Sequence, residues 1–383
     1  MCGSPSNYSA MKMLNFLNLR LNEAPRLGAI MTPDHNSFGL VRLVLALLVL
    51  VSHSYQYLGG SMAAEPLNDL TGRSLGEYAV QVFFVLSGLL VAKSFQDSSS
   101  VLDFSAARVL RIFPALIVCV ALTALVLGPA MTSLSVNGYF LDAGLFAYLA
   151  KTLSLSTGAA TLPGVFESTP LSGRVNTSLW TLKYEVLCYA VLALAGCFGL
   201  FDPRRRALVA LGLALFLLVI FCNPPALKQS YAFTDSLRYF SVFFGTGVLA
   251  YLLRHRLILS GWLVVPMCAL FICSRGTNMA ELGSALSLGY LAFYGATKTF
   301  GPLRAFANRM DLSYGVYIYA GPLQQTMISQ MPGIAPIVLS SLTMLLVMPI
   351  ALMSWLWVEK PALRMRHSLR STRWFPLSAT PIR

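Results

Sequence analysis

Residues 38–57 read FGLVRLVLALLVLVSHSYQY, and in this stretch only Arg42 interrupts the apolar run before it becomes more polar at Ser52. A helix needs about 20 apolar residues to cross a bilayer. Comparable stretches recur to the end of the chain, separated by glycine and proline. The sequence therefore predicts an all-α, polytopic transmembrane bundle of about ten spans, at 38–57, 74–94, 109–128, 178–200, 207–223, 236–253, 257–274, 281–299, 312–330 and 335–357.

The composition agrees with a membrane protein. The chain has 383 residues, of which 56% are hydrophobic and 11% are charged, whereas soluble domains carry about 25% charged residues. Its net charge of +13 comes from short basic clusters between apolar runs, which is typical of topology signals and not of a nucleic-acid-binding face. No CxxC occurs among the seven cysteines, so no metal site is predicted.

The basic clusters also predict an orientation, because cytoplasmic loops are enriched in lysine and arginine. With the N-terminus inside, the inner loops hold the richer clusters and the C-terminus also lies in the cytoplasm. The segment 139–157 contains Asp142 and Lys151, and a crossing there would reverse every later cluster. We therefore expect 129–177 to be a long outside loop with a short interfacial or re-entrant helix.

Three regions follow from this topology. Residues 1–37 are predicted to be a poorly ordered cytoplasmic tail, in which Met1 and Met31 are both candidate initiators. Residues 38–357 form the transmembrane domain, and 358–383 form a basic cytoplasmic tail. In the second span, Ser87-Gly88 is expected to allow close helix packing and not to take part in catalysis.

Ionisable residues inside spans are costly and are therefore candidates for function. They are Arg42, His53, Glu77, Lys183 and Glu185. Eleven residues separate Arg42 from His53, which places both on one helix face about 16 Å apart along the axis. This arrangement suits a donor molecule with an anionic head and a reactive tail. The alternative is a snorkelling arginine and a packing histidine.

A neutral, buried imidazole can act as a general base, and a carboxylate on its other nitrogen would fix its tautomer. Glu185 and Glu77 are both expected at the depth of His53, and the sequence does not choose between them. At the inner side, Arg108 and Arg111 lie one helical turn apart and can grip phosphates through their planar guanidinium groups.

Several motifs together resemble the acyltransferase 3 family, integral membrane O-acyltransferases of bacteria that modify cell-surface glycans. They are Arg42-x10-His53, VFFVLSG at 82–88, Arg108-x-x-Arg111, SLWTLKYE at 178–185, DLSYGVY at 311–317 and EKP at 359–361. Many members carry a histidine after the SYG motif, but this chain reads IYAGP at 318–322, so a second catalytic histidine is not expected.

The resemblance implies that His53 is catalytic and that Arg42, Arg108 and Arg111 serve acyl-CoA binding. Glu185 and Glu77 stay the two candidates for the carboxylate that supports His53, because of their expected depth. It implies acetyl-CoA or another acyl-CoA as donor, with no permanently bound cofactor. The implied acceptor is a glycan or lipid-linked saccharide, and the implied location is the bacterial cytoplasmic (inner) membrane. Trp180 and Tyr184 are candidate substrate contacts, although Trp180 also suits an interfacial aromatic belt.

Two other functions are compatible with intramembrane charges. A secondary transporter would show internal symmetry between two halves, and the sequence has none that we can detect. A non-catalytic component of a polysaccharide export system would tolerate replacement of His53.

Overall fold

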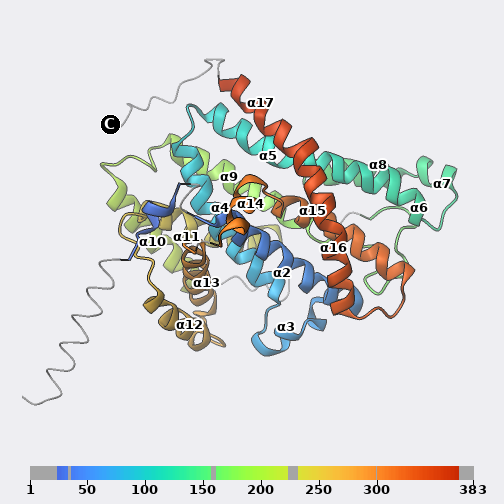
Figure 1. Ribbon diagram of the computed structural model, residues 1–383, viewed down its shortest axis with the longest axis horizontal. Helices are drawn as coiled ribbons and strands as arrows, with labels where there is room; N and C mark the ends of the chain where they lie inside the picture. The colour runs from blue at the N-terminus through green and yellow to red at the C-terminus, as the bar shows by residue number, and fades with distance from the viewer. Residues whose placement is uncertain (1–23, 33–35, 157–160, 223–231, 299, 371–383) are drawn as a thin grey trace, which may run out of the picture.

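The computed structural model describes residues 24–32, 36–156, 161–222, 232–298 and 300–370. These residues form a bundle of helices with two isolated β-bridges and, within the described ranges, no strand. The helices surround α2 and α4, which are packed against α15 and α11, respectively (Figure 1).

The first half of the chain contributes η1 (Leu27–Ile30), α2 (Phe38–Gly59), η3 (Met62–Ala64), α3 (Pro66–Thr71), α4 (Leu75–Gln96), α5 (Val101–Leu122), η4 (Thr123–Leu127), α6 (Gly128–Met131), α7 (Val136–Leu141), α8 (Ala143–Leu153), η5 (Leu179–Thr181) and α9 (Leu182–Cys197). The second half contributes α10 (Arg206–Cys222), α11 (Phe233–Leu252), η6 (Gly261–Leu263), α12 (Val264–Cys273), α13 (Ala280–Ala296), α14 (Pro302–Arg309), α15 (Ser313–Gln330), α16 (Pro336–Ser354), η7 (Trp355–Glu359) and α17 (Lys360–Arg370).

Every predicted span falls on a helix, and the all-α fold is confirmed. Five helical stretches of the described chain are long and apolar enough to cross a membrane: Phe38–Gly59, Leu75–Gln96, Val101–Met131, Leu179–Cys197 and Pro336–Arg366. The other predicted spans coincide with shorter or more polar helices, such as α10 and α15. The count of ten spans and the orientation of the termini therefore stay predictions.

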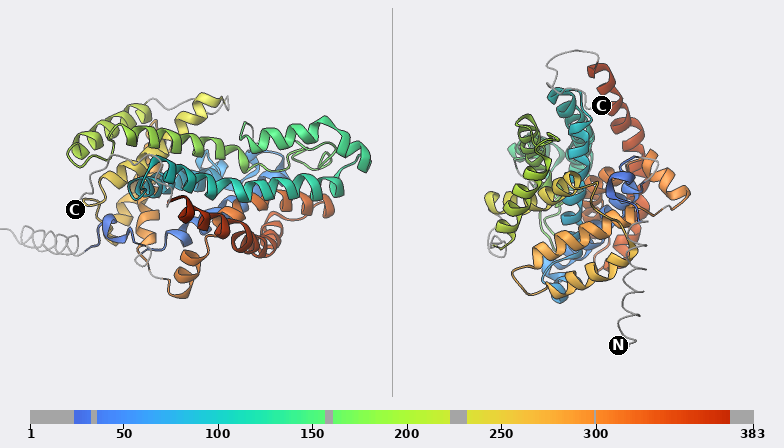
Figure 2. Two further views of the ribbon diagram at one scale, coloured as in Figure 1. Left: turned by 90° about the horizontal axis from the view of Figure 1, so that it is seen from above. Right: turned by 90° about the vertical axis from the view of Figure 1, so that its left-hand side faces the viewer.

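The segment after the third span folds back on the helix that precedes it. α5, a π-helical turn and α6 form one stretch from Val101 to Met131, and α8 runs alongside its second half (Figure 2). Tyr139 of α7 is buried there and donates a hydrogen bond to the carbonyl of Ala124. At 11 residues, α8 is about 16 Å long, which is too short for a crossing.

The closest helix contact joins α4 and α11. A Cβ atom at Gly88 would lie 2.0 Å from the carbonyl oxygen of Phe244, and one at Gly247 would lie 1.9 Å from that of Val85. Both positions therefore require glycine, because any side chain would meet the backbone of the partner helix. The packing role predicted for Gly88 is confirmed, whereas the neighbouring Ser87 faces a polar cluster described below.

The end of the predicted N-terminal tail is packed against the bundle. Leu27 is buried, and its N–H donates to the carbonyl of Leu257, while Gly28 N–H donates to that of Arg254. Residues 24–32 are thus held against the bundle by backbone hydrogen bonds. Residues 1–23 and 33–35 lie outside the described ranges, so the poorly ordered tail at 1–37 stays a prediction.

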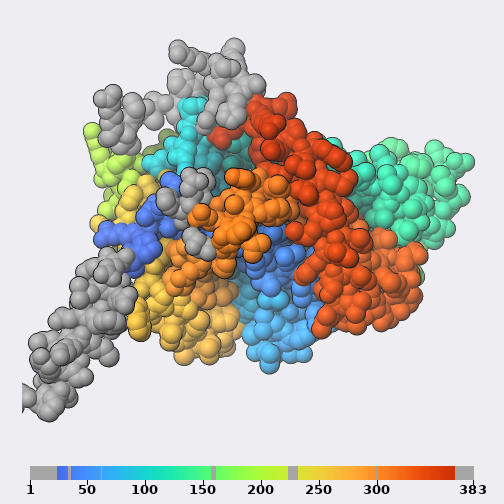
Figure 3. Space-filling model, in the orientation of Figure 1, coloured from blue at the N-terminus to red at the C-terminus, as the bar shows by residue number. Residues whose placement is uncertain are grey.

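The last helices cover one face of the bundle. α16 continues through a π-helical turn, η7, into the basic helix α17, which packs on α5. Both α16 and α14 contact α2, and Figure 3 shows α14, α16 and α17 together on the viewed face. A π-turn places one extra residue in the helix and often marks a functional position; here it carries Glu359, which is 1% exposed. Of the predicted 358–383 tail, residues 371–383 lie outside the described ranges.

Candidate active site

Two arginines of the predicted site converge on one carboxylate. Arg42 Nη1 lies 2.5 Å and Arg111 Nη2 lies 2.7 Å from Oδ2 of Asp311. Arg111 Nη1 also lies 2.8 Å from Oε2 of Glu359. Two cations and two anions from α2, α5, the α14–α15 loop and η7 thus form a cluster with no net charge.

The carboxylates of this cluster are held in place for their partners. Ser313 donates a hydrogen bond to Oδ1 of Asp311, and Ser354 donates one to Oε1 of Glu359. Burial by itself raises the pKa of Asp311, but Arg111 and Arg42 outweigh it and hold that pKa well below its usual range. Asp311 therefore stays charged at neutral pH, and both arginines stay paired.

Arg108 is placed differently, although it is one turn from Arg111. Its Nη2 donates to the Ser94 hydroxyl at 3.2 Å, and its guanidinium carbon lies 5.8 Å from the ring centre of Tyr189. Its Nε is buried without a hydrogen-bond partner, and in the described part of the chain Arg108 makes no ion pair. The RxxR motif thus contains one ion-paired arginine and one that is available to an anion.

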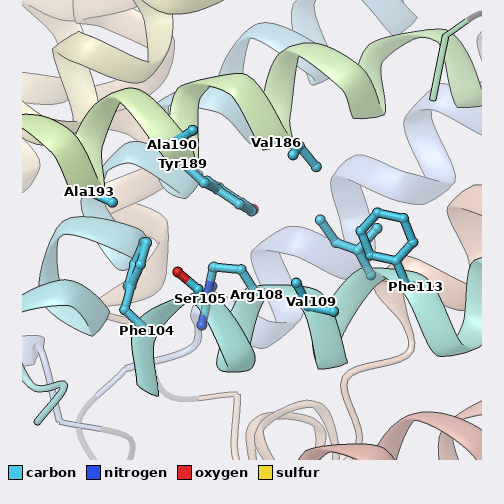
Figure 4. A pocket seen from close by; sticks show the side chains of 10 residues that line it. Phe104, Ser105, Arg108, Val109, Phe113, Val186, Tyr189, Ala190 and Ala193 are labelled. Carbon is cyan, nitrogen blue, oxygen red and sulfur yellow. The ribbon is translucent and has the colours of Figure 1, made fainter. Parts of the chain in front are cut away.

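Arg108 also borders a cavity of about 160 Å³ between α5 and α9. Arg108 and Ser105 from α5 and Tyr189 from α9 point into the gap between the two helices (Figure 4). The cavity exists because two residues of α9 that face α5, Ala190 and Ala193, have small side chains. Its lining consists of Phe104, Ser105, Arg108, Val109, Ile112, Phe113, Val186, Tyr189, Ala190 and Ala193.

A polar stripe on η5 and α9 leads from Arg108 toward His53. Ser178, Thr181, Glu185 and Tyr189 are spaced by three, four and four residues, which places them on one helix face. The stripe spans eleven residues, or about 16 Å. This length equals the predicted spacing between Arg42 and His53 on α2.

Neighbouring helices complete the α9 stripe, which we define as Ser178, Thr181, Glu185 and Tyr189. Tyr189 Oη donates to Oε1 of Glu185, and Ser87 Oγ from α4 donates to the same oxygen at 3.3 Å. Thr181 Oγ1 and Tyr317 Oη from α15 lie 2.7 Å apart. The carboxylate of Glu185 therefore accepts hydrogen bonds from two hydroxyl groups, those of Tyr189 and Ser87.

His53 lies at the other end of the α9 stripe. It is 8% exposed, and its Nδ1 lies 3.4 Å from Ser178 Oγ. Ser178 is fixed in turn, because its N–H donates to Oδ1 of Asn176, whose Nδ2 donates to the carbonyl of Ile318 on α15. The imidazole is therefore oriented by a hydroxyl on a tethered segment.

Glycine at 321 permits this arrangement. A Cβ atom there would lie 2.8 Å from Tyr57 Oη and 2.9 Å from Asn176 Oδ1. Tyr57 Oη accepts hydrogen bonds from the N–H and hydroxyl of Thr177, both at 3.0 Å. A larger residue in this part of α15 would displace the segment that contacts His53.

Neither predicted carboxylate is hydrogen-bonded to His53 in the described structure. Glu77 forms a capping box with Ser74 at the start of α4 and lies 3.6 Å from Arg73. Glu185 bonds Tyr189 and Ser87 instead. The group next to Nδ1 is Ser178, so a carboxylate does not fix the imidazole here; catalytic roles for Glu77 and Glu185 stay predictions.

The predicted substrate contacts belong to an aromatic cluster. The Trp180 ring centre lies 5.3 Å from that of Phe240, and Tyr184 stacks at a tilt on Phe240 and Phe233. Lys183 Nζ lies 4.8 Å from the Tyr184 ring centre. Tyr184 is 1% exposed and has a packing role in this structure, while contact of either ring with substrate stays a prediction.

Sequence reasoning missed the partners of the site residues. Asp311 and Glu359 lie in the quoted DLSYGVY and EKP motifs, and Ser178 opens the SLWTLKYE motif, so the motifs contained the signal. Tyr189 follows Glu185 by one helical turn, and a search for polar residues at helical spacing on 178–200 would have found it.

Comparison with known proteins shows that this helical bundle is an integral membrane acyltransferase. Residues 35–358 match the acyltransferase 3 family, described as an acyltransferase domain, and the chain belongs to this family.

Two relatives cover most of the chain. It is 31% identical to an O-acetyl transferase of Shigella phage Sf6, over 85% of this chain and 95% of that protein. It is 30% identical to nodulation protein 10 of Rhizobium leguminosarum bv. viciae, over 88% of this chain and 96% of that protein. No solved structure matches.

Proposed function

We propose that this enzyme transfers an acetyl group from acetyl-CoA to a hydroxyl of a glycan or lipid-linked saccharide at the bacterial cytoplasmic membrane. The observation that carries the proposal is the α9 stripe, which joins an available arginine to a buried histidine across about 16 Å. The name of the phage relative, O-acetyl transferase, supports acetyl as the acyl group.

The donor is proposed to enter with its phosphates near Arg108. A buried guanidinium without a carboxylate partner favours an anion, because charge-assisted hydrogen bonds to phosphate are strong. The thioester arm of the donor would then run along the α9 stripe, whose hydroxyl groups can bond its amides. With Arg108 on the cytoplasmic side, His53 faces the outer half of the membrane, where an exported glycan would arrive.

His53 is proposed to act as the general base. The acceptor oxygen attacks the thioester carbonyl carbon while His53 takes the hydroxyl proton. The carbon–sulfur bond breaks, and the proton passes from His53 to the departing sulfur. The products are an O-acetyl ester and free CoA, and the histidine returns to its neutral form. The Ser178 hydroxyl keeps the imidazole oriented throughout.

Two assays test this function. The gene is deleted, and the masses of surface glycans are compared with and without mild base. We expect a base-labile acetyl group that is absent from the deletion strain. The purified protein in proteoliposomes is then given acetyl-CoA and the deacetylated glycan, and thiol release is followed. Unaltered glycans and no acceptor-dependent thiol release would contradict the proposal and favour a transporter or scaffold.

A further inference from the structure

A second cavity lies between the end of α4 and α17, next to Ser94. It measures about 240 Å³ and is lined by Leu90, Lys93, Ser94, Asp97 and Arg366. Ser94 belongs to its wall and also accepts the hydrogen bond from Arg108 Nη2. An anion in this cavity would therefore be adjacent to the arginine that the proposed function assigns to the donor phosphates.

Arg366 is held in the wall of this cavity by contacts on one side of its guanidinium group. Its Nε donates to Oδ1 of Asp103 at 2.7 Å, and its Nη2 donates to Ser98 Oγ at 3.2 Å. Asp103 is 6% exposed and also accepts from the N–H of Ser99 near the start of α5. Arg366, which comes from the separate helix α17, is thus fixed in position before any ligand binds.

Lys93 is held far more weakly. It pairs with Asp97 one turn along α4, and the two side chains are 33% and 55% exposed. Exposed pairs at this spacing contribute little to stability, so a phosphate can displace Asp97 at small cost. Arg254 interacts electrostatically with Asp97 and with a further cation, Arg206.

The size and charge of the cavity indicate which part of a donor it fits. Ligand sites for whole small molecules measure roughly 300–1,000 Å³, so this cavity is suited to a single group. A phosphate monoester carries nearly two charges at pH 7 and is matched by a fixed guanidinium and an adaptable ammonium group. CoA bears such a monoester on its ribose, separate from the diphosphate.

We propose that the cavity between Lys93 and Arg366 binds the ribose 3′-phosphate of the CoA donor, while Arg108 binds its diphosphate. This inference rests on the proposed function, because it assumes an acyl-CoA donor. It assigns binding to two residues outside the family motifs, Lys93 in the last turn of α4 and Arg366 in the middle of α17. Such a subsite would favour CoA over carriers that share only the pantetheine arm.

The test compares acetyl-CoA with acetyl-dephospho-CoA, which lacks only the 3′-phosphate, using the full-length protein in proteoliposomes. Wild type should show a KM about tenfold or more lower for acetyl-CoA, as expected for a charge-assisted hydrogen bond. In Lys93→Gln and Arg366→Gln, the ratio of the two KM values should fall toward one. Asp97→Asn should increase the ratio of the two KM values, because it removes the carboxylate that competes with the phosphate for Lys93.

Arg364→Gln is the matched control, because Arg364 lies on the same helix, is exposed and does not line the cavity. It removes the same charge and should keep the wild-type ratio. Lys93→Gln is expected to remain folded, because it removes only the exposed ion pair with Asp97. The test therefore does not depend on Arg366→Gln alone. A wild-type ratio in both Lys93→Gln and Arg366→Gln overturns the subsite but leaves the donor assignment intact. Absence of transfer from either donor in wild type would instead overturn the proposed function.

Discussion

The Nδ1 atom of His53 lies 3.4 Å from the hydroxyl oxygen of Ser178, although 125 residues separate the two in sequence. The contact crosses from α2 to the start of η5 and orients the only buried imidazole in the described part of the chain. It implies that a neutral hydroxyl, rather than a carboxylate, sets the position of the proposed general base.

Ser178→Ala should lower kcat for acetyl transfer about fivefold while leaving the KM for acetyl-CoA nearly unchanged, because one neutral hydrogen bond contributes about 1 kcal/mol. The pH dependence of kcat should shift as well, since the imidazole loses a partner. Ser178→Thr keeps the hydroxyl and should restore most of the rate. A Thr variant as slow as the Ala variant would point to packing and not to orientation.

The two arginines of the RxxR motif should behave differently. Arg108→Ala should raise the KM for acetyl-CoA at least tenfold with little change in thermal unfolding in detergent. Arg111→Ala should instead destabilise the protein by about 3–5 kcal/mol, because it leaves Glu359 buried without a cation.

The control for this pair is a second substitution. Adding Glu359→Gln to Arg111→Ala removes the uncompensated charge and should recover part of the lost stability. Glu359→Gln added to Arg108→Ala, in contrast, should leave the raised KM for acetyl-CoA unchanged. Equal effects of Arg108→Ala and Arg111→Ala on donor affinity, both in stable protein, would show that the whole motif binds CoA.

Two glycine substitutions test the packing of the bundle. Gly247→Ala should lower the free energy of unfolding by about 1–3 kcal/mol or more, which is the usual cost of overpacking. The added Cβ atom would collide with the carbonyl oxygen of Val85. Gly212→Ala, in α10, meets no atom and should raise helix stability by up to about 1 kcal/mol. Opposite signs are expected in one thermal unfolding assay, and a stable Gly247→Ala variant would contradict the close α4–α11 contact.

The positions of the helices could be predicted because hydropathy is a local signal. Each predicted span falls on a helix. The third helix begins at Val101, eight residues before the predicted start at 109, because the polar residues Asp103 and Arg108 in its first turns lower the hydropathy there. These polar residues find partners elsewhere in the bundle, which a hydropathy profile does not register.

The site was predictable only where its residues share one helix. The spacing of Arg42 and His53 placed them on one face of α2, but their partners are 269 and 125 residues away. Which carboxylate or hydroxyl meets them depends on how α2 packs against η5 and the α14–α15 loop. Glu77 and Glu185 were predicted as partners of His53 only because they are expected at the same depth in the membrane. Equal depth does not determine which side chains of different helices touch.

The role of His53 as general base is decided by the rate of acetyl transfer in His53→Gln. Glutamine keeps the approximate size and can still bond Ser178, but it cannot take a proton. We expect a rate about 10²–10⁴-fold below wild type, with yield in the membrane and acetyl-CoA binding near normal. A stable His53→Gln variant that transfers acetyl at the wild-type rate would show that His53 is not the base.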